Sequence, residues 1–305
     1  MAYGIAVDGS GSVYVTGASQ GSGTGYDYAT IKYRSWGDIA WVRRYNGPGN
    51  GDDWASDAIA VDGSGNVYVA GFSTGSATGY DYTTIKYRSN GDTAWVRSYN
   101  GNDGDDLACG IAVDGYGHVY VTGYSTGSGT GYDYTTIKYY SNGDTAWVRS
   151  YDGPGNLDDV THAITVDGSG NVYVTGTSST SIGADSGDYA TIKYYSNGGT
   201  AWVRRYNGPG KGVDEARAMA VDGSGSVYVT GWSYGSGTKD DFATVKYHSN
   251  GDIAWVKRYD GLDIWRDKAW AIAVDGSGNV YVTGSSMCYV TIKYVQFLRG
   301  DANER

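Results

Sequence analysis

Short apolar runs of strand length alternate along this chain with clusters of Gly, Asn, Asp and Ser. In one representative stretch the runs predict four strands, at Ile59–Asp62, Val67–Gly71, Tyr82–Tyr87 and Ala94–Tyr99. The sequence GSGN joins the first two strands and SNGD joins the last two, and both suit tight turns that require positive φ. The pattern therefore predicts a four-stranded antiparallel meander.

This unit occurs six times, with a period of about 53 residues. The copies of its first strand begin near Ile5, Ile59, Ile111, Ile164, Met219 and Ile272. A fixed period of this length is typical of propellers and solenoids. We therefore expect residues 1–296 to form a single all-β domain and residues 297–305 to form a tail.

The predicted strands carry bulky side chains at both odd and even positions, as in YTTIKY and AWVRSY. Because side chains alternate between the two faces of a sheet, each sheet should be covered on both faces. A linear stack would leave an apolar sheet at each end without a polar cap, whereas a ring has no ends. The sequence therefore predicts a closed β-propeller of six four-stranded blades.

Two residue types recur at one position of the unit. Lys recurs in all six third strands, and Trp recurs in five fourth strands, at Trp41, Trp95, Trp147, Trp202 and Trp255. A residue placed identically in each unit is expected to serve packing, with Trp filling the space between blades and Lys lying along aromatic rings or meeting an Asp.

The sixth copy departs from the others. Its second and third strands are joined by a shorter segment, and no AWVRRY sequence follows the third strand. Three explanations are open: residues Val295 to Arg299 form a degenerate outer strand, the last blade has three strands, or the chain is part of a longer propeller. We expect a six-bladed ring whose final blade is irregular or three-stranded.

Composition and charge narrow the range of partners. The chain has 50 Gly and 31 Tyr but only 3 Pro, which favours strands and turns and almost no helix. A formal charge of −10 would repel nucleic acid and anionic lipid. No run of 18 apolar residues and no basic leader is present, so we expect a soluble monomer without membrane insertion or export signal. Cys109 and Cys288 occupy non-equivalent positions and predict free thiols.

The sequences IAVDGSGNVYVTG, DYTTIKY and GDTAWVRSYNG resemble the repeat named for the seven-bladed β-propeller, the SBBP-type repeat. The resemblance extends over nearly the whole chain, although the copies number six. It implies a propeller exposed at the surface of a microbial cell or secreted from it, and it brings no shared catalytic residues.

The final residues, FLRGDAN, resemble the start of a dockerin-type calcium loop, with Asp301 and Asn303 as oxygen ligands. Arg305 stands where a further Asp would be required, so the resemblance does not extend to a complete calcium loop.

Departures from the repeat are the candidates for ligand binding. The long connections, between second and third strands and between successive units, should share one face of the propeller, and they diverge most among the copies. Five unrepeated aromatic residues fall there: Trp54, Trp232, Tyr234, Trp265 and Trp270. They suit stacking on sugar rings, with carboxylates accepting hydrogen bonds from hydroxyl groups. Alternatively, they pack against neighbouring loops.

An Asp also recurs just ahead of the first strand, at Asp53, Asp106, Asp159, Asp214 and Asp267. If that strand is innermost, these carboxylates would circle the mouth of a central channel. There they could bind a divalent cation such as calcium, repel anions or hold cationic groups. Alternatively, each Asp caps a local turn. No other cofactor is expected.

Catalysis is not expected from the motifs present. The histidines, His118, His162 and His248, are at non-equivalent positions, and the chain has no GxSxG, HExxH or phosphate-binding GxxxxGK motif. The leading hypothesis is a noncatalytic binding or scaffold module that recognises carbohydrate or a surface protein through the long-loop face. The alternatives are a polysaccharide hydrolase or lyase with a carboxylate pair at the channel mouth and a structural spacer without a ligand.

Overall fold

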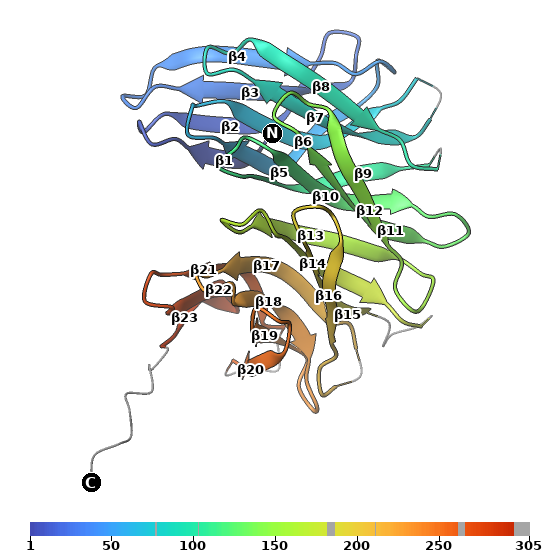
Figure 1. Ribbon diagram of the computed structural model, residues 1–305, viewed down its shortest axis with the longest axis vertical. Helices are drawn as coiled ribbons and strands as arrows, with labels where there is room; N and C mark the ends of the chain where they lie inside the picture. Colours follow the sequence, from blue (N-terminus) through green and yellow to red (C-terminus); the bar gives the residue numbers. More distant parts are fainter. Residues whose placement is uncertain (77, 103, 182–186, 211, 262–265, 296–305) are drawn as a thin grey trace.

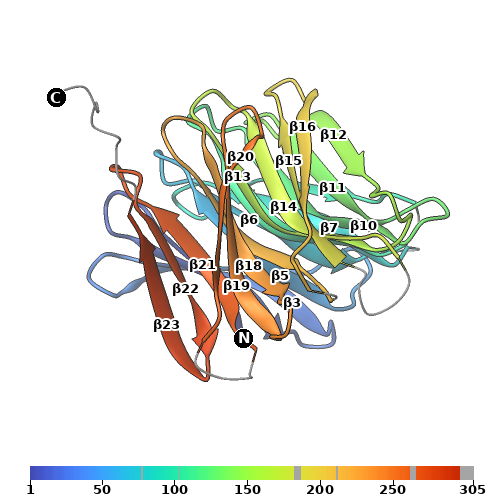
Figure 2. The same cartoon turned by 90° about the horizontal axis from the view of Figure 1, so that it is seen from below.

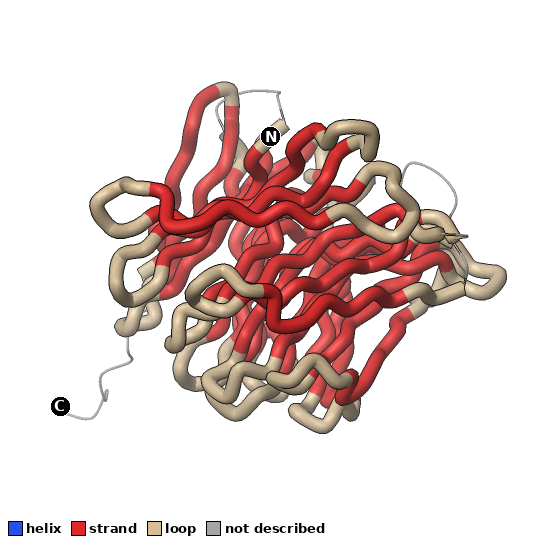
Figure 3. Tube along the Cα trace, turned by 90° about the horizontal axis from the view of Figure 1, so that it is seen from above, coloured by secondary structure: helices blue, strands red, loops and turns tan. Residues whose placement is uncertain are grey.

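A computed structural model describes residues 1–76, 78–102, 104–181, 187–210, 212–261 and 266–295. These residues form 23 β-strands and no helix (Figure 1). The strands make six antiparallel sheets, five of four strands and one of three, which stand side by side as blades (Figures 1 and 3). The predicted all-β propeller of six blades is confirmed. Within the described ranges no helix is long and apolar enough to cross a membrane.

Consecutive strands pair within every blade, so each blade is a meander. Blades one to three contain β1 (Ala2–Val7), β2 (Val13–Gln20), β3 (Tyr26–Tyr33), β4 (Ile39–Tyr45), β5 (Asp53–Val61), β6 (Val67–Thr74), β7 (Tyr80–Tyr87), β8 (Thr93–Tyr99), β9 (Asp106–Val113), β10 (Val119–Thr126), β11 (Tyr132–Tyr139) and β12 (Thr145–Tyr151). Blades four to six contain β13 (Asp159–Val166), β14 (Val172–Ser179), β15 (Gly187–Tyr194), β16 (Thr200–Tyr206), β17 (Glu215–Val221), β18 (Val227–Tyr234), β19 (Asp240–Tyr247), β20 (Ile253–Tyr259), β21 (Lys268–Val274), β22 (Val280–Ser286) and β23 (Cys288–Tyr294).

The tight turns at one edge of each blade are closed by polar side chains and by glycine. In the turn from β5 to β6, one carboxylate oxygen of Asp62 accepts the backbone N–H groups of Ser64 and Asn66, both at 2.9 Å. Gly65 in that turn has a φ of 74°, and Gly91 in the turn from β7 to β8 has a φ of 90°. Glycine adopts such values without the steric cost that a Cβ brings. The predicted glycine turns are confirmed.

Successive blades pack through two unlike faces, and we call each contact between successive blades a seam. In the first seam, Tyr14 and Trp41 of blade one pack on Val67, Val69 and Ile85 of blade two. The same pairing of an aromatic face with an aliphatic face recurs at the later seams. Blades two to five thus bury both faces of their sheets, as the bulky residues at odd and even positions predicted.

The recurrent Trp and Lys side chains are packing elements, as predicted. The indole N–H of Trp41 donates to the carbonyl of Ser89 in the next blade at 3.2 Å. The Lys32 ammonium lies 5.0 Å from the centre of the Tyr14 ring and also donates to Ser89. Both side chains therefore join one blade to the next.

In the described residues the ring does not close between blades one and six, whereas the sequence predicted a closed propeller. Figure 1 shows the first and last sheets at the two ends of an arc, and Figure 2 shows blade six at its end beside blade five. Ile5 and Val7 of blade one are 69% and 60% exposed, and Tyr289 of blade six is 78% exposed. Tyr82, which corresponds to Tyr289 in blade two, is fully buried.

The composition of blade six accounts for the open seam. Its sheet has three strands in the described part of the chain, as one of the three alternatives predicted, whereas residues 296–299 of the predicted degenerate outer strand lie outside the described residues. In the other blades the fourth strand supplies the Trp that covers the next sheet. Without this strand, a contact between blade six and blade one lacks the largest apolar side chain of the seam.

The first strand of each blade is innermost, because β1, β5, β9, β13, β17 and β21 contact one another in succession. These strands begin earlier than predicted. For example, β5 begins at Asp53, six residues ahead of the predicted start at Ile59. Part of the segment that was expected to be a long loop is therefore strand, and this change positions the candidate site.

Candidate functional site

Every inner strand carries a shift in its pairing register at the same place, and the residue that bulges there differs in each blade. One residue bulges in each of five blades, at Tyr3, Cys109, His162, Arg217 and Trp270, and in blade two the bulge spans Ser56, Asp57 and Ala58. A bulge directs a side chain out of the regular alternation of a strand. Burial raises the pKa of Asp57 in blade two, and His162 of blade four opposes this rise across the intervening blade. The bulge side chains therefore surround a common central space.

Blades four and five bring a His, a Glu and an Arg together at this space. His162 Nε2 lies 3.2 Å from Glu215 Oε1, and Arg217 pairs with the same carboxylate. Arg217 Nη1 lies 3.5 Å from His162 Nδ1. The His162 and Glu215 side chains are each 19% exposed and that of Arg217 is 31% exposed, so a ligand can reach them. This group can donate hydrogen bonds to a polar ligand and accept them from it.

Of the bulge residues of blades two and three, Cys109 is partly buried and Asp57 is exposed. Burial, with a contribution from the Asp57 carboxylate, raises the pKa of the Cys109 thiol to about 12. Because a thiolate is the reactive form of cysteine, Cys109 is not an activated nucleophile at neutral pH.

Blades one and two form an aromatic hollow next to the opening of the ring. The ring centre of Trp54 lies 5.9 Å from that of Tyr3 and 4.9 Å from that of Tyr26. Tyr3, Trp54 and Phe72 line a hollow of about 520 Å³ together with Asp57. This size is in the range of small-molecule sites. The hollow thus combines apolar ring faces with one carboxyl group.

Blades five and six form a second aromatic cluster, on the other side of the opening. The rings of Trp232 and Trp270 lie 5.1 Å apart. The Arg217 guanidinium lies 4.8 Å from the ring centre of Trp232 and 5.4 Å from that of Trp270, and the Lys268 ammonium lies 3.7 Å from Trp232. Trp232 is 4% exposed and Trp270 is 48% exposed. Trp270 therefore presents a ring to a ligand, and Trp232 supports it from beneath.

The predicted ligand-binding aromatic residues lie on strands rather than on loops, because the strands extend further than predicted. Trp54 is in β5, Trp232 and Tyr234 are in β18, and Trp270 is in β21. The structure brings Trp232 and Trp270 together and places Trp54 in the separate hollow. Trp265 lies outside the described residues, as do Asp301 and Asn303 of the tail.

The five recurrent Asp residues are buried in the seams and do not line an open channel mouth, which corrects the expected arrangement. Their exposed fractions are 0% or 1%. Each accepts the backbone N–H of a glycine five or six residues earlier, in the connection between successive blades. The residues are Asp53, Asp106, Asp159, Asp214 and Asp267. Each carboxylate thus closes the local connection, in the manner of the turn cap considered as the alternative.

Comparison with protein families agrees with the repeated architecture. The family described as beta-propeller repeat matches residues 147–184, 201–237 and 267–286. Three segments of this chain therefore resemble beta-propeller repeats. No curated protein matches its sequence.

Several solved structures are similar to these beta-propeller repeats in fold. A polysaccharide lyase, Uly1, has a TM-score of 0.53 and 11% sequence identity, over 96% of this chain and 81% of that chain. A protein of unknown function from Bacteroides caccae has a TM-score of 0.47 and 13% identity, over 84% and 81%. A gluconolactonase from Xanthomonas campestris has a TM-score of 0.44 and 10% identity, over 90% and 86%. At this identity, the similarity to the lyase supports the fold and not an activity.

The bulge residues of the beta-propeller repeats were missed by the sequence reasoning, although a signal was present. In each repeat the residue before an invariant small residue, Gly or Ala, is different, as with His162 before Ala163 and Arg217 before Ala218. Variation at a single position inside a repeated strand indicates a side chain that packing does not determine. Glu215 shows the same variation at the residue that follows the recurrent Asp.

Carboxyl groups in the seams and in the turns give the stability of the propeller opposite dependences on pH. Burial raises the pKa of four seam carboxyls above the ordinary value of 3.8: Asp53, Asp106, Asp159 and Asp214. In the turns, burial also acts to raise the pKa, but the accepted hydrogen bonds outweigh it and the pKa is lowered at Asp62, Asp114, Asp167 and Asp222.

Mild acidification should therefore stabilise the protein when divalent cations are removed. A raised folded-state pKa contributes stability that is full below the unfolded value and is lost as pH rises through the folded value. A lowered pKa contributes stability that is lost only as pH falls below the unfolded value. We expect the melting temperature in chelator to rise from pH 7 toward pH 4 and to fall below it. Asp159→Asn should reduce this rise in melting temperature. An unchanged rise would contradict the attribution of the pH dependence to the seam carboxyls.

Proposed function

We propose that this chain is a noncatalytic carbohydrate-binding propeller, which takes a saccharide into the central space between its inner strands. The observation that supports the proposal is the pair of aromatic clusters around Trp54, where blade two meets blade one, and around Trp270, where blade six meets blade five. Aromatic rings offer apolar faces that can stack on the apolar faces of sugar rings.

Polar groups beside both clusters would orient the saccharide. Asp57 lies in the hollow of Trp54, and Glu215 and Arg217 lie beside Trp270. These side chains can bond sugar hydroxyl groups. Arg217 pairs with Glu215, and Lys268 lies 3.7 Å from Asp240, so each cation has an acidic partner. This balance suits a neutral, hydroxyl-rich ligand better than a strongly charged one.

Removing the ring of Trp54 or that of Trp270 should weaken carbohydrate binding about tenfold, because an aromatic contact of this kind contributes up to about 1.5 kcal/mol. The measurement is affinity electrophoresis against a panel of soluble polysaccharides, followed by calorimetry with the best of them, for Trp54→Ala and Trp270→Ala. Trp36→Ala is the matched control, since Trp36 is 70% exposed in a tight turn at the opposite edge of blade one. Binding that survives both test substitutions would refute the proposed site. Failure to bind any saccharide would favour a surface protein as the partner or a structural spacer.

A polysaccharide hydrolase or lyase is the second candidate, and the contact of His162 with Glu215 beside Arg217 favours it. A histidine held by a carboxylate can accept a proton, and a guanidinium can stabilise a developing negative charge. Release of shortened chains from a bound polysaccharide would support catalysis if His162→Ala abolished the release and kept the binding. Binding without release supports the noncatalytic function. A location outside the cell stays a prediction from the repeat resemblance.

A further inference from the structure

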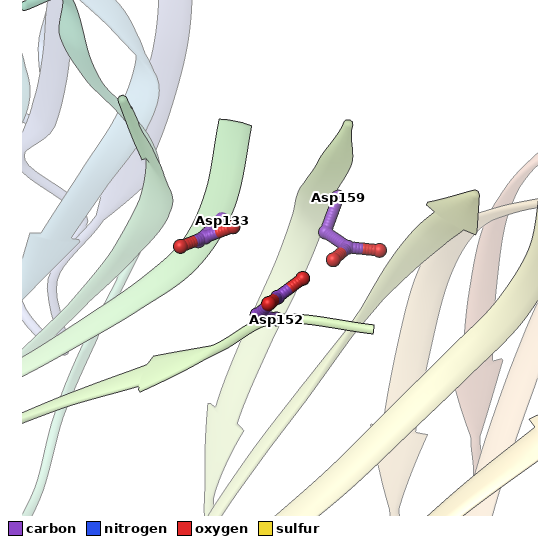
Figure 4. A group of neighbouring side chains, drawn as sticks. All are labelled: Asp133, Asp152 and Asp159. Atoms are coloured by element: carbon purple, nitrogen blue, oxygen red, sulfur yellow. The ribbon is translucent and has the colours of Figure 1, made fainter. Parts of the chain in front are cut away.

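Three carboxylates converge where blade three meets blade four. Asp133 is the second residue of β11, Asp152 follows β12, and Asp159 is the first residue of β13. One oxygen of each lies within 4.8 Å of an oxygen of the other two (Figure 4). Asp152 is exposed, Asp133 is half-buried and Asp159 is fully buried, so the cluster leads from solvent into the seam.

The buried member of this cluster has an oxygen without a partner. Asp159 is 0% exposed, and its Oδ2 accepts the backbone N–H of Gly153. Its Oδ1 lies beside the Ser178 hydroxyl but accepts no hydrogen bond. The nearby Ser178 hydroxyl accepts a hydrogen bond from Arg205. Figure 4 shows an oxygen of Asp159 directed toward Asp152. An unpartnered carboxylate oxygen is costly to bury, and a bound cation would remove that cost.

The equivalent seams after blades one, four and five contain a counter-charge that this one lacks, whereas blade two has Ser98 at the position of the Arg. The residues that correspond to Asp133 in blades one, four and five each pair with an Arg of the same blade, at distances of 2.9, 3.1 and 2.8 Å. The pairs are Asp27 with Arg44, Asp188 with Arg205, and Asp241 with Arg258. Blade three has Ser150 at the position of the Arg. Within the described ranges, none of Asp133, Asp152 and Asp159 forms an ion pair.

The same seam also gains a negative charge. Asp152 replaces the Asn that stands at the equivalent position after the outer strands of blades one, two and four, at Asn46, Asn100 and Asn207. The positive charge of Arg205 in blade four acts on Asp159. Its guanidinium is, however, already paired with Asp188 and hydrogen-bonded to Ser178 and Tyr151. Compared with blades one and four, blade three therefore has one positive charge fewer and one carboxylate more.

We propose that Asp133, Asp152 and Asp159 bind a divalent cation of the calcium type. Calcium takes six to eight oxygen ligands and prefers carboxylates, and water can complete its coordination at the exposed side of Asp152. Such an ion would neutralise the cluster and join the strands of blade three to the inner strand of blade four. It would supply the positive charge that Arg44, Arg205 and Arg258 supply in their own blades.

A second acidic cluster provides an internal control. Asp241, Asp260 and Asp267 have the same arrangement where blade five meets blade six. One oxygen of Asp241 likewise lacks a partner, but its other oxygen lies 2.8 Å from Arg258. This Arg already supplies one positive charge, so we expect weaker cation binding there.

The test is calcium chloride added to the chelator-treated full chain, followed by thermal denaturation and calorimetry. At a calcium concentration about a hundred times the dissociation constant, the melting temperature should rise by roughly 5 °C, because the ion binds only the folded state. Asp152→Asn changes an exposed side chain, so folding should be kept while the shift is lost. Asp260→Asn should keep the shift, and sodium chloride at equal ionic strength should not reproduce it.

Ser150→Arg separates cation binding from other effects of calcium. The new guanidinium should take the place of the ion, as in the equivalent blades, so that the variant is more stable than the parent in chelator and gains no shift from calcium. The proposal would be overturned if the parent showed no calcium shift. A shift retained in both Asp152→Asn and Ser150→Arg would overturn it equally.

Discussion

Trp147→Ala should lower the free energy of unfolding by about 4 kcal/mol, since it removes a large aromatic side chain from a packed seam. Trp147 is 8% exposed, and its ring lies 6.4 Å from Tyr120 and 5.9 Å from Tyr194. Its indole N–H donates to the carbonyl of Ser196 in blade four at 3.2 Å. The substitution would leave a cavity between two blades and remove one of the two hydrogen bonds that the Ser196 carbonyl accepts. Urea denaturation followed by circular dichroism measures the loss.

Trp36→Ala is the matched control for this prediction. Trp36 is 70% exposed and donates only to Asp38 in its own turn, at 2.8 Å. Its removal should change the unfolding free energy by less than about 0.5 kcal/mol. If Trp147→Ala were as mild as the control, the recurrent Trp would not be a packing element of the seams.

Gly176→Ala should destabilise the propeller by about 3 kcal/mol, because the added methyl group has no space. Gly176 in β14 lies opposite the bulge of β13 at His162. A Cβ at this position would overlap the backbone carbonyl of Val160 and lie 2.9 Å from the Tyr134 hydroxyl. Backbone atoms of a paired strand cannot rotate away as a flexible side chain can. The substitution should therefore move β13 and the bulge.

Gly168→Ala tests whether the effect is local. A Cβ at Gly168 meets open space, and this residue is not among the glycines with positive φ. Its replacement should leave the melting temperature nearly unchanged, while Gly176→Ala should also weaken ligand binding at the central space through His162. Equal melting temperatures for the two variants would contradict the proposed link between the glycine and the bulge.

The repeated glycine and the variable bulge residue are two parts of one arrangement. The six glycines that end the sequence VYVTG or its variants all have an inner-strand carbonyl where a Cβ would be, at Gly17, Gly71, Gly123, Gly176, Gly231 and Gly284. Glycine thereby permits the inner strand to bulge toward its neighbour. The bulge in turn presents a different side chain from each blade to the central space, which allows a uniform scaffold to carry a varied site.

The strands and turns were predictable because their determinants are local. Alternating apolar residues and glycine turns identified β6, β7 and β8 to within three residues of the observed ends. The start of β5 was missed by six residues, because the bulge around Asp57 interrupts the alternation on which the prediction rested. Aromatic candidates such as Trp54 were therefore expected on loops, although they lie on inner strands.

The candidate sites could be predicted only in part, because they join residues that are far apart in sequence. His162 and Arg217 are neighbours at the central space but belong to different repeats. Asp159 was recognised as one of a recurrent set, whereas its contact with Asp133 and Asp152 depends on how blade four meets blade three. The missing Arg at Ser150 gains its meaning only when the equivalent ion pairs are seen in the other blades.

The sequence by itself determined the number of units, the meander in each unit and the role of the recurrent Trp and Lys, because identical neighbours impose the same packing at each repeat. The tertiary structure decided which side chains face the central space and which carboxylates share a seam, because a bulge and the stacking of blades set these positions. It also showed that blades one and six do not meet in the described part of the chain. Closure depends on whether the two end faces fit, and blade six lacks the Trp-bearing strand that completes this contact elsewhere.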